Sequence, residues 1–78
     1  MKKQSHRADW ETKVAIDNAK GWIAVELHRT ADAKSTVVAR VVFWDAEGQY
    51  SLETIGDELP LVIVEELIAE ARQTIKVP

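Results

Sequence analysis

The feature that most constrains this chain is a period-two alternation of apolar and polar residues, which occurs in four separate runs. The runs cover residues 10–17, 22–29, 36–44 and 49–55, and they are rich in β-branched and aromatic side chains. Alternate residues of a strand point to opposite faces, so these runs predict half-buried β-strands. The connections are too short to hold a crossover helix. We therefore expect four strands in an antiparallel meander, in the order 1-2-3-4.

The connections between the runs predict how the strands pair. NAKG at 18–21 and DAEG at 45–48 resemble four-residue hairpin loops, because each ends in a glycine that can adopt positive φ. ADAKS at 31–35 is expected to be a five-residue loop. These lengths place four residues of alternating charge in one row across the sheet: Lys13, Glu26, Arg40 and Glu53. Opposite charges at paired positions favour this register.

The spacing of apolar residues changes after residue 58. Spacings of three and four in residues 59–78 predict one helix of about four turns, with Pro60 in its first turn and Pro78 preventing extension. A sheet with one helix on one face is a two-layer ββββα fold of the α+β class. We expect residues 9–78 to form a single domain and residues 1–8, which lack periodicity, to be a disordered basic tail.

The expected core joins one face of the sheet to one stripe of the helix. The sheet contributes Trp10, Val14, Ile16, Ile23, Val25, Leu27, Val37, Val41, Phe43, Tyr50 and Leu52, and the helix contributes Leu61, Val64, Leu67, Ile68 and Ile75. Val62 and Ile63 lie off this stripe. They are expected either to be buried by the sheet edge or to form a helix–helix dimer contact.

The opposite face of the sheet is the candidate binding surface. It is expected to present Trp22, Trp44, Val42, Val38, Arg40 and Lys13. Three interpretations are open: a cross-strand tryptophan pair that stabilises the sheet, an interface with a second copy or another protein, and a stacking platform for single-stranded nucleic acid. The net charge of −3 and the pI of about 5.3 disfavour nucleic acid.

Composition and motifs restrict the remaining function classes. The 78 residues include no cysteine, which excludes disulfides and a cysteine nucleophile. The most apolar run is too short and too charged to span a bilayer, and no signal peptide is recognisable, so a cytoplasmic location is expected. No phosphate-binding loop, nucleophile motif or metal-spaced cluster is present. His28 is expected to be a surface histidine, and Glu65, Glu66 and Glu70 a solvated acidic face.

Together these observations predict a small non-catalytic interaction module without a cofactor or a metal. It is expected to self-associate, as a homodimer, or to bind a protein partner through the exposed sheet face or the helix. The alternative is a single-stranded nucleic-acid-binding module that uses the tryptophan-bearing face and the basic N-terminal residues.

Overall fold

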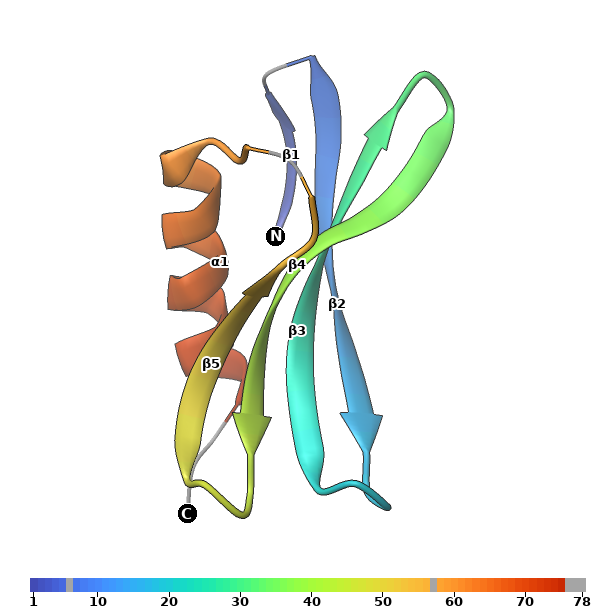
Figure 1. Ribbon diagram of the computed structural model, residues 1–78. Coiled ribbons are helices and arrows are strands. Elements are labelled where there is room, and N and C mark those ends of the chain that lie inside the picture. Colours follow the sequence, from blue (N-terminus) through green and yellow to red (C-terminus); the bar gives the residue numbers. More distant parts are fainter. Residues whose placement is uncertain (6, 57, 76–78) are drawn as a thin grey trace.

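The computed structural model describes residues 1–5, 7–56 and 58–75. An antiparallel sheet of five strands, in sequence order, packs against one C-terminal helix (Figure 1). The elements are β1 (Lys2–Ser5), β2 (Ala8–Asp17), β3 (Trp22–Ala31), β4 (Lys34–Trp44), β5 (Gln49–Thr54) and α1 (Leu61–Thr74). The α+β class with an antiparallel sheet is confirmed, whereas the predicted count of four strands was wrong.

The additional strand, β1, lies in residues 1–8, where a disordered tail was expected. It pairs antiparallel with the first part of β2. Two charge contacts attach it to α1: the N-terminal ammonium of Met1 binds Glu70, and Lys3 Nζ lies 3.0 Å from Glu66 Oε1. These partners are 69 and 63 residues apart in the sequence. Alternation within the segment could not reveal a strand that is held by such distant contacts.

The predicted register is confirmed over most of the sheet. The structure pairs Lys13 with Glu26, Glu26 with Arg40, and Arg40 with Glu53. Both predicted four-residue loops are present, and their last residues, Gly21 and Gly48, have φ of +76° and +65°. Glycine adopts this left-handed region without the steric cost that a Cβ imposes, which explains its position in both loops.

The third loop is shorter than predicted. Asp32 and Ala33 alone connect β3 to β4, with φ of +53° and +63°. Positive φ at both central residues is the geometry of a type I′ turn, which matches the twist of paired strands. Residues 31–35 contain no glycine that would indicate such a turn, and the predicted five-residue loop was wrong.

A β-bulge in β4 reconciles this short turn with the register below it. Leu27 pairs with Ala39 but His28 pairs with Val37, so Val38 is the extra residue. Val38 is 7% exposed and belongs to the core cluster, although it was predicted on the opposite face. Val37, predicted in the core, instead lies beside His28 outside that cluster. The bulge therefore exchanges the environments of these two valines.

The core lies between α1 and the central part of the sheet. Its buried members are Ala8, Trp10, Val25, Leu27, Val38, Ala39, Val41, Phe43, Ile63, Leu67, Ala71 and Ile75. The predicted helix stripe was partly wrong, because Ile63 is fully buried while Leu61 is 73% exposed. Residues 61–64 are all apolar, so spacing alone could not define which side faces the sheet. Pro60, which was predicted in the first turn, is the N-cap residue directly before the helix. Pro78 lies outside the described residues.

Three sheet residues predicted in the core are exposed instead, in addition to Leu61 of the helix. Val14, Ile16 and Leu52 lie on the helix side of the sheet with exposures of 52%, 61% and 45%. One helix of 14 residues does not cover the whole face of a five-stranded sheet. The outer parts of β2 and β5 are left uncovered as a result.

Candidate interaction surfaces

The outer face of the sheet carries most of the predicted binding residues. Trp22 and Trp44 are cross-strand partners, and their rings form an edge-to-face pair with centroids 6.4 Å apart and an interplanar angle of 61°. The guanidinium of Arg40 lies 5.0 Å from the centre of the Trp22 ring. Arg40 also donates two hydrogen bonds to Glu53, from Nε at 2.9 Å and from Nη2 at 3.3 Å. These side chains therefore bind one another.

The small residues on this outer face are sealed from solvent. Ala24 and Val42 are both 0% exposed although neither belongs to the main core cluster. Val42, predicted as a binding residue, thus has no surface to offer a partner. Lys13 remains exposed, and it lies beside Glu26 in the charge row. The outer face is a thin packed layer with its polar groups largely paired.

The helix carboxylates have a structural role that the sequence analysis missed. The Met1 ammonium donates to Thr12 Oγ1 at 2.6 Å and also to Glu70. Burial raises the pKa of Glu70, but hydrogen bonds from the ammonium and Thr12, together with the ammonium charge, outweigh it and lower the pKa from its ordinary value. The signal that could have revealed this contact is the pairing of basic residues near the N-terminus with glutamates spaced by one helical turn.

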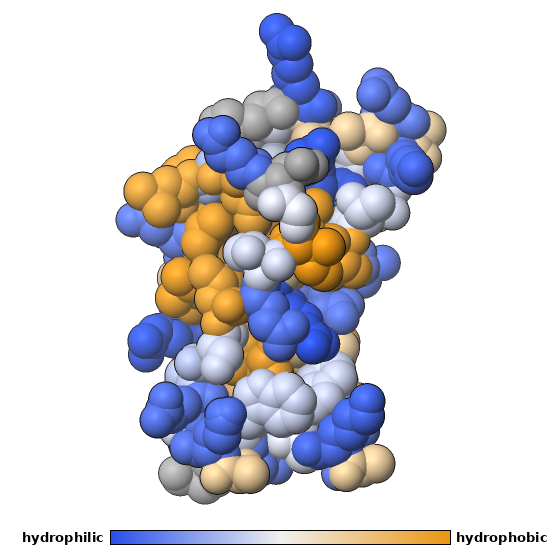
Figure 2. Space-filling view, viewed as in Figure 1, coloured by the Kyte–Doolittle hydropathy of each residue, from blue (hydrophilic) through white to orange (hydrophobic). Residues whose placement is uncertain are grey.

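Most of the exposed large apolar side chains lie on the helix side of the molecule, whereas alternation along β5 puts Ile55 on the outer face with Glu53. The large hydrophobic residues with the greatest exposure are Val14, Ile16, Leu52, Ile55, Leu61 and Val62, at 45–73%. Four of them belong to β5, the segment that follows it and the start of α1. Figure 2 shows hydrophobic surface over α1, next to β5. The internal contacts do not explain this exposed apolar surface.

A small cavity lies between the β5 edge and α1. It has a volume of about 160 Å³, and its lining comprises Val41, Tyr50, Ser51, Leu52, Ile68 and Arg72. The Tyr50 hydroxyl donates to the carbonyl oxygen of Ile75 at 2.9 Å, and the Arg72 guanidinium lies 5.4 Å from the Tyr50 ring centre. These contacts hold Tyr50 and Arg72 in place beside the cavity, and Leu52, which also lines it, is 45% exposed.

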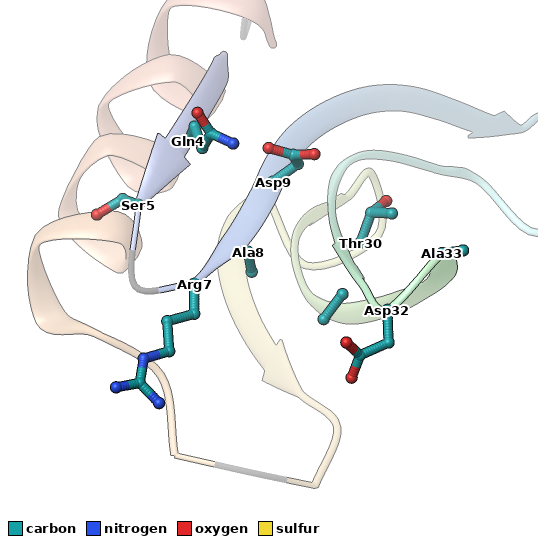
Figure 3. Close-up of a pocket in the computed structure, with 9 residues that line it drawn as sticks. Gln4, Ser5, Arg7, Ala8, Asp9, Thr30, Asp32 and Ala33 are labelled. Atoms are coloured by element: carbon teal, nitrogen blue, oxygen red, sulfur yellow. The ribbon is translucent and has the colours of Figure 1, made fainter.

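A larger, polar cavity of about 520 Å³ lies between the β1–β2 turn and the β3–β4 turn. Its lining comprises Gln4, Ser5, Arg7, Ala8, Asp9, Thr30, Ala31, Asp32 and Ala33, and Figure 3 shows Arg7 and Asp32 on the two turns that flank it. Arg7, Asp32 and Ala33 all have positive φ. The lining combines one arginine with two aspartates, so it has no dominant charge that would select a ligand.

Comparison with protein-family models, with curated proteins and with solved structures returns no match for this chain. Within residues 1–5, 7–56 and 58–75, no group of three or more His, Cys, Asp or Glu side chains could hold a metal ion. In the same residues, α1 falls short of the length and apolarity that crossing a bilayer requires. Function is therefore inferred from the surfaces of the chain itself.

Proposed function

We propose that this protein is a small interaction module, without a catalytic role of its own, that self-associates through apolar surface on its helix side. The observation that carries this proposal is the exposure of Leu52 on β5 and of Leu61 and Val62 at the start of α1, each 45% exposed or more. Single exposed apolar residues are ordinary, whereas a group of them on a small domain indicates an interaction site. The lack of cysteine accords with a cytoplasmic location.

The contacts favour the helix side over the tryptophan-bearing outer face as the interface. Trp22 already contacts both Trp44 and Arg40, and Val42 is fully buried. A partner on the outer face would have to displace these contacts before making its own. A partner on the helix side would cover side chains that are now in water, which is the favourable direction for apolar surface.

The alternative of a nucleic-acid-binding module has weaker support. Phosphate binding requires available cations, and base stacking requires accessible ring faces. Arg40 is held by Glu53 and lies against Trp22, while Lys3 is held by Glu66. The net charge of −3 adds long-range repulsion of a phosphate backbone.

Sedimentation velocity tests the proposal. We expect a monomer–dimer equilibrium in the range of about 1–100 µM, which corresponds to about −6 to −8 kcal/mol of association free energy. Apolar burial predicts a dissociation constant that changes less than about threefold between low and moderate salt. Monomer at every concentration would refute self-association, and steeply salt-dependent binding of a single-stranded oligonucleotide would favour the alternative.

Trp44→Ala is the variant that separates the two faces. It removes the aromatic pair from the outer face and leaves the helix side intact. We expect this variant to dimerise as the wild type does. A dimer that dissociates on this substitution would move the interface to the outer face.

A further inference from the structure

We propose that two copies of this chain associate by antiparallel pairing of their β5 strands about a twofold axis at Leu52. The pairing would join the two sheets into one and place both helices on the same face. This inference rests on the self-association proposed above, and it names the interface.

The backbone of β5 has an edge available for pairing. Within the part of the chain that the structure describes, β5 pairs only with β4, at the end of the strand order. Ile55 N donates to Val38 O at 2.9 Å, so odd-numbered residues of β5 direct their backbone groups toward β4. Tyr50, Leu52 and Thr54 therefore direct their N–H and C=O groups outward. The strand contains neither lysine nor proline, which are common guards of an exposed edge.

The sequence of β5 is compatible with its own reversed copy. An axis at Leu52 sets Leu52 opposite Leu52 of the other copy, Tyr50 opposite Thr54, and Ser51 opposite Glu53. Aromatic residues pair well with β-branched ones, and the Ser51 hydroxyl can donate to the Glu53 carboxylate. Three outward pairs, with two hydrogen bonds each, give about six backbone hydrogen bonds between the copies.

The charge on β5 does not oppose this arrangement. Glu53 is the strand's one ionisable carboxylate, and its oxygens accept hydrogen bonds from Arg40 of the same chain at 2.9 and 3.3 Å. The two Glu53 side chains would therefore enter the interface already paired with a cation. Like-charge repulsion across the axis is correspondingly small.

The helix side adds an apolar contact at the axis. Leu52 is 45% exposed and lines the cavity of about 160 Å³ together with Ile68. A second Leu52, placed directly opposite, would cover the exposed part of this side chain and remove both leucines from water. The pairing therefore accounts both for the exposure of Leu52 and for the cavity beside it.

Charges on α1 favour a second copy of this chain as the occupant. Ile68 and Arg72 line the cavity beside β5, and the three- and four-residue spacing puts Glu65 on the same side of the helix. A twofold axis reverses the helix of the other copy. Glu65 of each copy then faces Arg72 of the other, so the two helices are complementary in charge as they pass the axis.

The other free edge of the sheet is less suitable. Beyond Thr12, where Met1 ends the pairing with a hydrogen bond of 3.0 Å, β2 has a free edge only over residues 13–17. Lys13 and Asp17 lie within this short edge. If two such edges paired about an axis at Ala15, each β2–β3 loop would meet Met1 of the other copy.

The decisive variant is Leu52→Lys, measured by sedimentation velocity on the full chain. It places two lysines opposite each other on the axis, and we expect it to weaken the dimer by at least about 30-fold. Ile16→Lys is the matched control, because Ile16 is an exposed aliphatic residue in the part of β2 that extends beyond its pairing with β1. We expect that control to dimerise like the wild type. Glu65→Arg should weaken the dimer, and adding Arg72→Glu should restore it.

Cross-linking keeps the inference testable even if Leu52→Lys fails to fold. The chain has no cysteine, so Leu52→Cys introduces a single thiol. A short bismaleimide should link two copies of this variant, because the thiols of directly opposed strand residues lie within its reach, and it should not link Ile16→Cys. A dimeric Leu52→Cys sample that does not cross-link, or a dimer that withstands Leu52→Lys, would overturn the β5 interface alone. A wild-type monomer at all concentrations would overturn self-association itself.

Discussion

Substituting Arg40 tests whether the outer face is a packed layer. Arg40 donates to Glu53 at 2.9 and 3.3 Å, and its guanidinium lies 5.0 Å from the centre of the Trp22 ring. Its side chain is 24% exposed, so most of its aliphatic stem is covered. We expect Arg40→Ala to lower the free energy of unfolding by about 2 kcal/mol.

The magnitude follows from three contributions. The Glu53 side chain is 41% exposed, so solvent screening limits the ion pair to about 0.5–1 kcal/mol. The cation–π contact with Trp22 adds about 0.5–1 kcal/mol at a partly exposed site. Loss of the stem from the surface of the sheet accounts for about 0.5 kcal/mol more.

Urea denaturation at one fixed protein concentration, followed by circular dichroism, measures the effect. Lys13→Ala is the matched control, because Lys13 lies in the same charge row and is exposed. We expect that control to change the free energy of unfolding by less than about 0.5 kcal/mol. In a double-mutant cycle, Arg40→Ala and Trp22→Leu should show a coupling of about 0.5–1 kcal/mol. Equal free energies of unfolding for the Arg40→Ala and Lys13→Ala variants would refute the inference that Arg40 is part of a packed layer on the outer face.

Three further predictions concern the turn, the N-terminal contact and the helix. Ala33→Gly should raise the free energy of unfolding by about 0.5–1 kcal/mol, because glycine adopts a φ of +63° without the steric cost that alanine has there. An unchanged urea midpoint would contradict the inference that Ala33 is strained. Because the pKa of Glu70 is lowered in the fold, its ionised form stabilises the chain above about pH 4.5, and this is lost as pH falls through the folded pKa. Glu70→Gln should therefore lower stability at pH 7 by about 1 kcal/mol and reduce the loss of stability in acid; parallel pH profiles for both proteins would oppose this assignment. Ile63→Ala should lower the free energy of unfolding by about 2–4 kcal/mol in thermal or urea denaturation, whereas Val62→Ala should lower it by under about 1 kcal/mol. The reverse order would show that Val62, and not Ile63, faces the sheet.

The strand pairing was largely predictable because its determinants are close together in the sequence. Glycine at the ends of two loops indicated their lengths, and those lengths pair Lys13 with Glu26 and Arg40 with Glu53. Each of these hairpins joins strands that are neighbours in the sequence, so turn chemistry and alternation suffice to define it. The pair of Glu26 and Arg40 was predicted from a five-residue loop, and the structure reaches the same pair through a two-residue turn and the bulge at Val38. The tryptophan pair followed from the same register.

The candidate surfaces were less predictable because they depend on how much of the sheet the helix covers. Alternation assigned Leu52 to the helix side, but it could not show how far the helix would extend over that side. Because of the bulge, Val38 lies in the core and not on the predicted binding face. No residue type in β4 indicates from the sequence that a bulge would form there. The interface proposed at β5 therefore depends on features that only the folded chain displays.

Periodicity and the turns between neighbouring segments were enough to predict the class of fold, the sequential order of the strands and the outer pairs of the charge row. The pairing of β1, the bulge at Val38 and the buried face of α1 arise only in the folded chain. These features depend on contacts between residues that are far apart in the sequence. Met1 and Lys3 find their partners on Glu70 and Glu66 only after the helix has packed, and Ile63 is distinguished from Leu61 only by the sheet it meets.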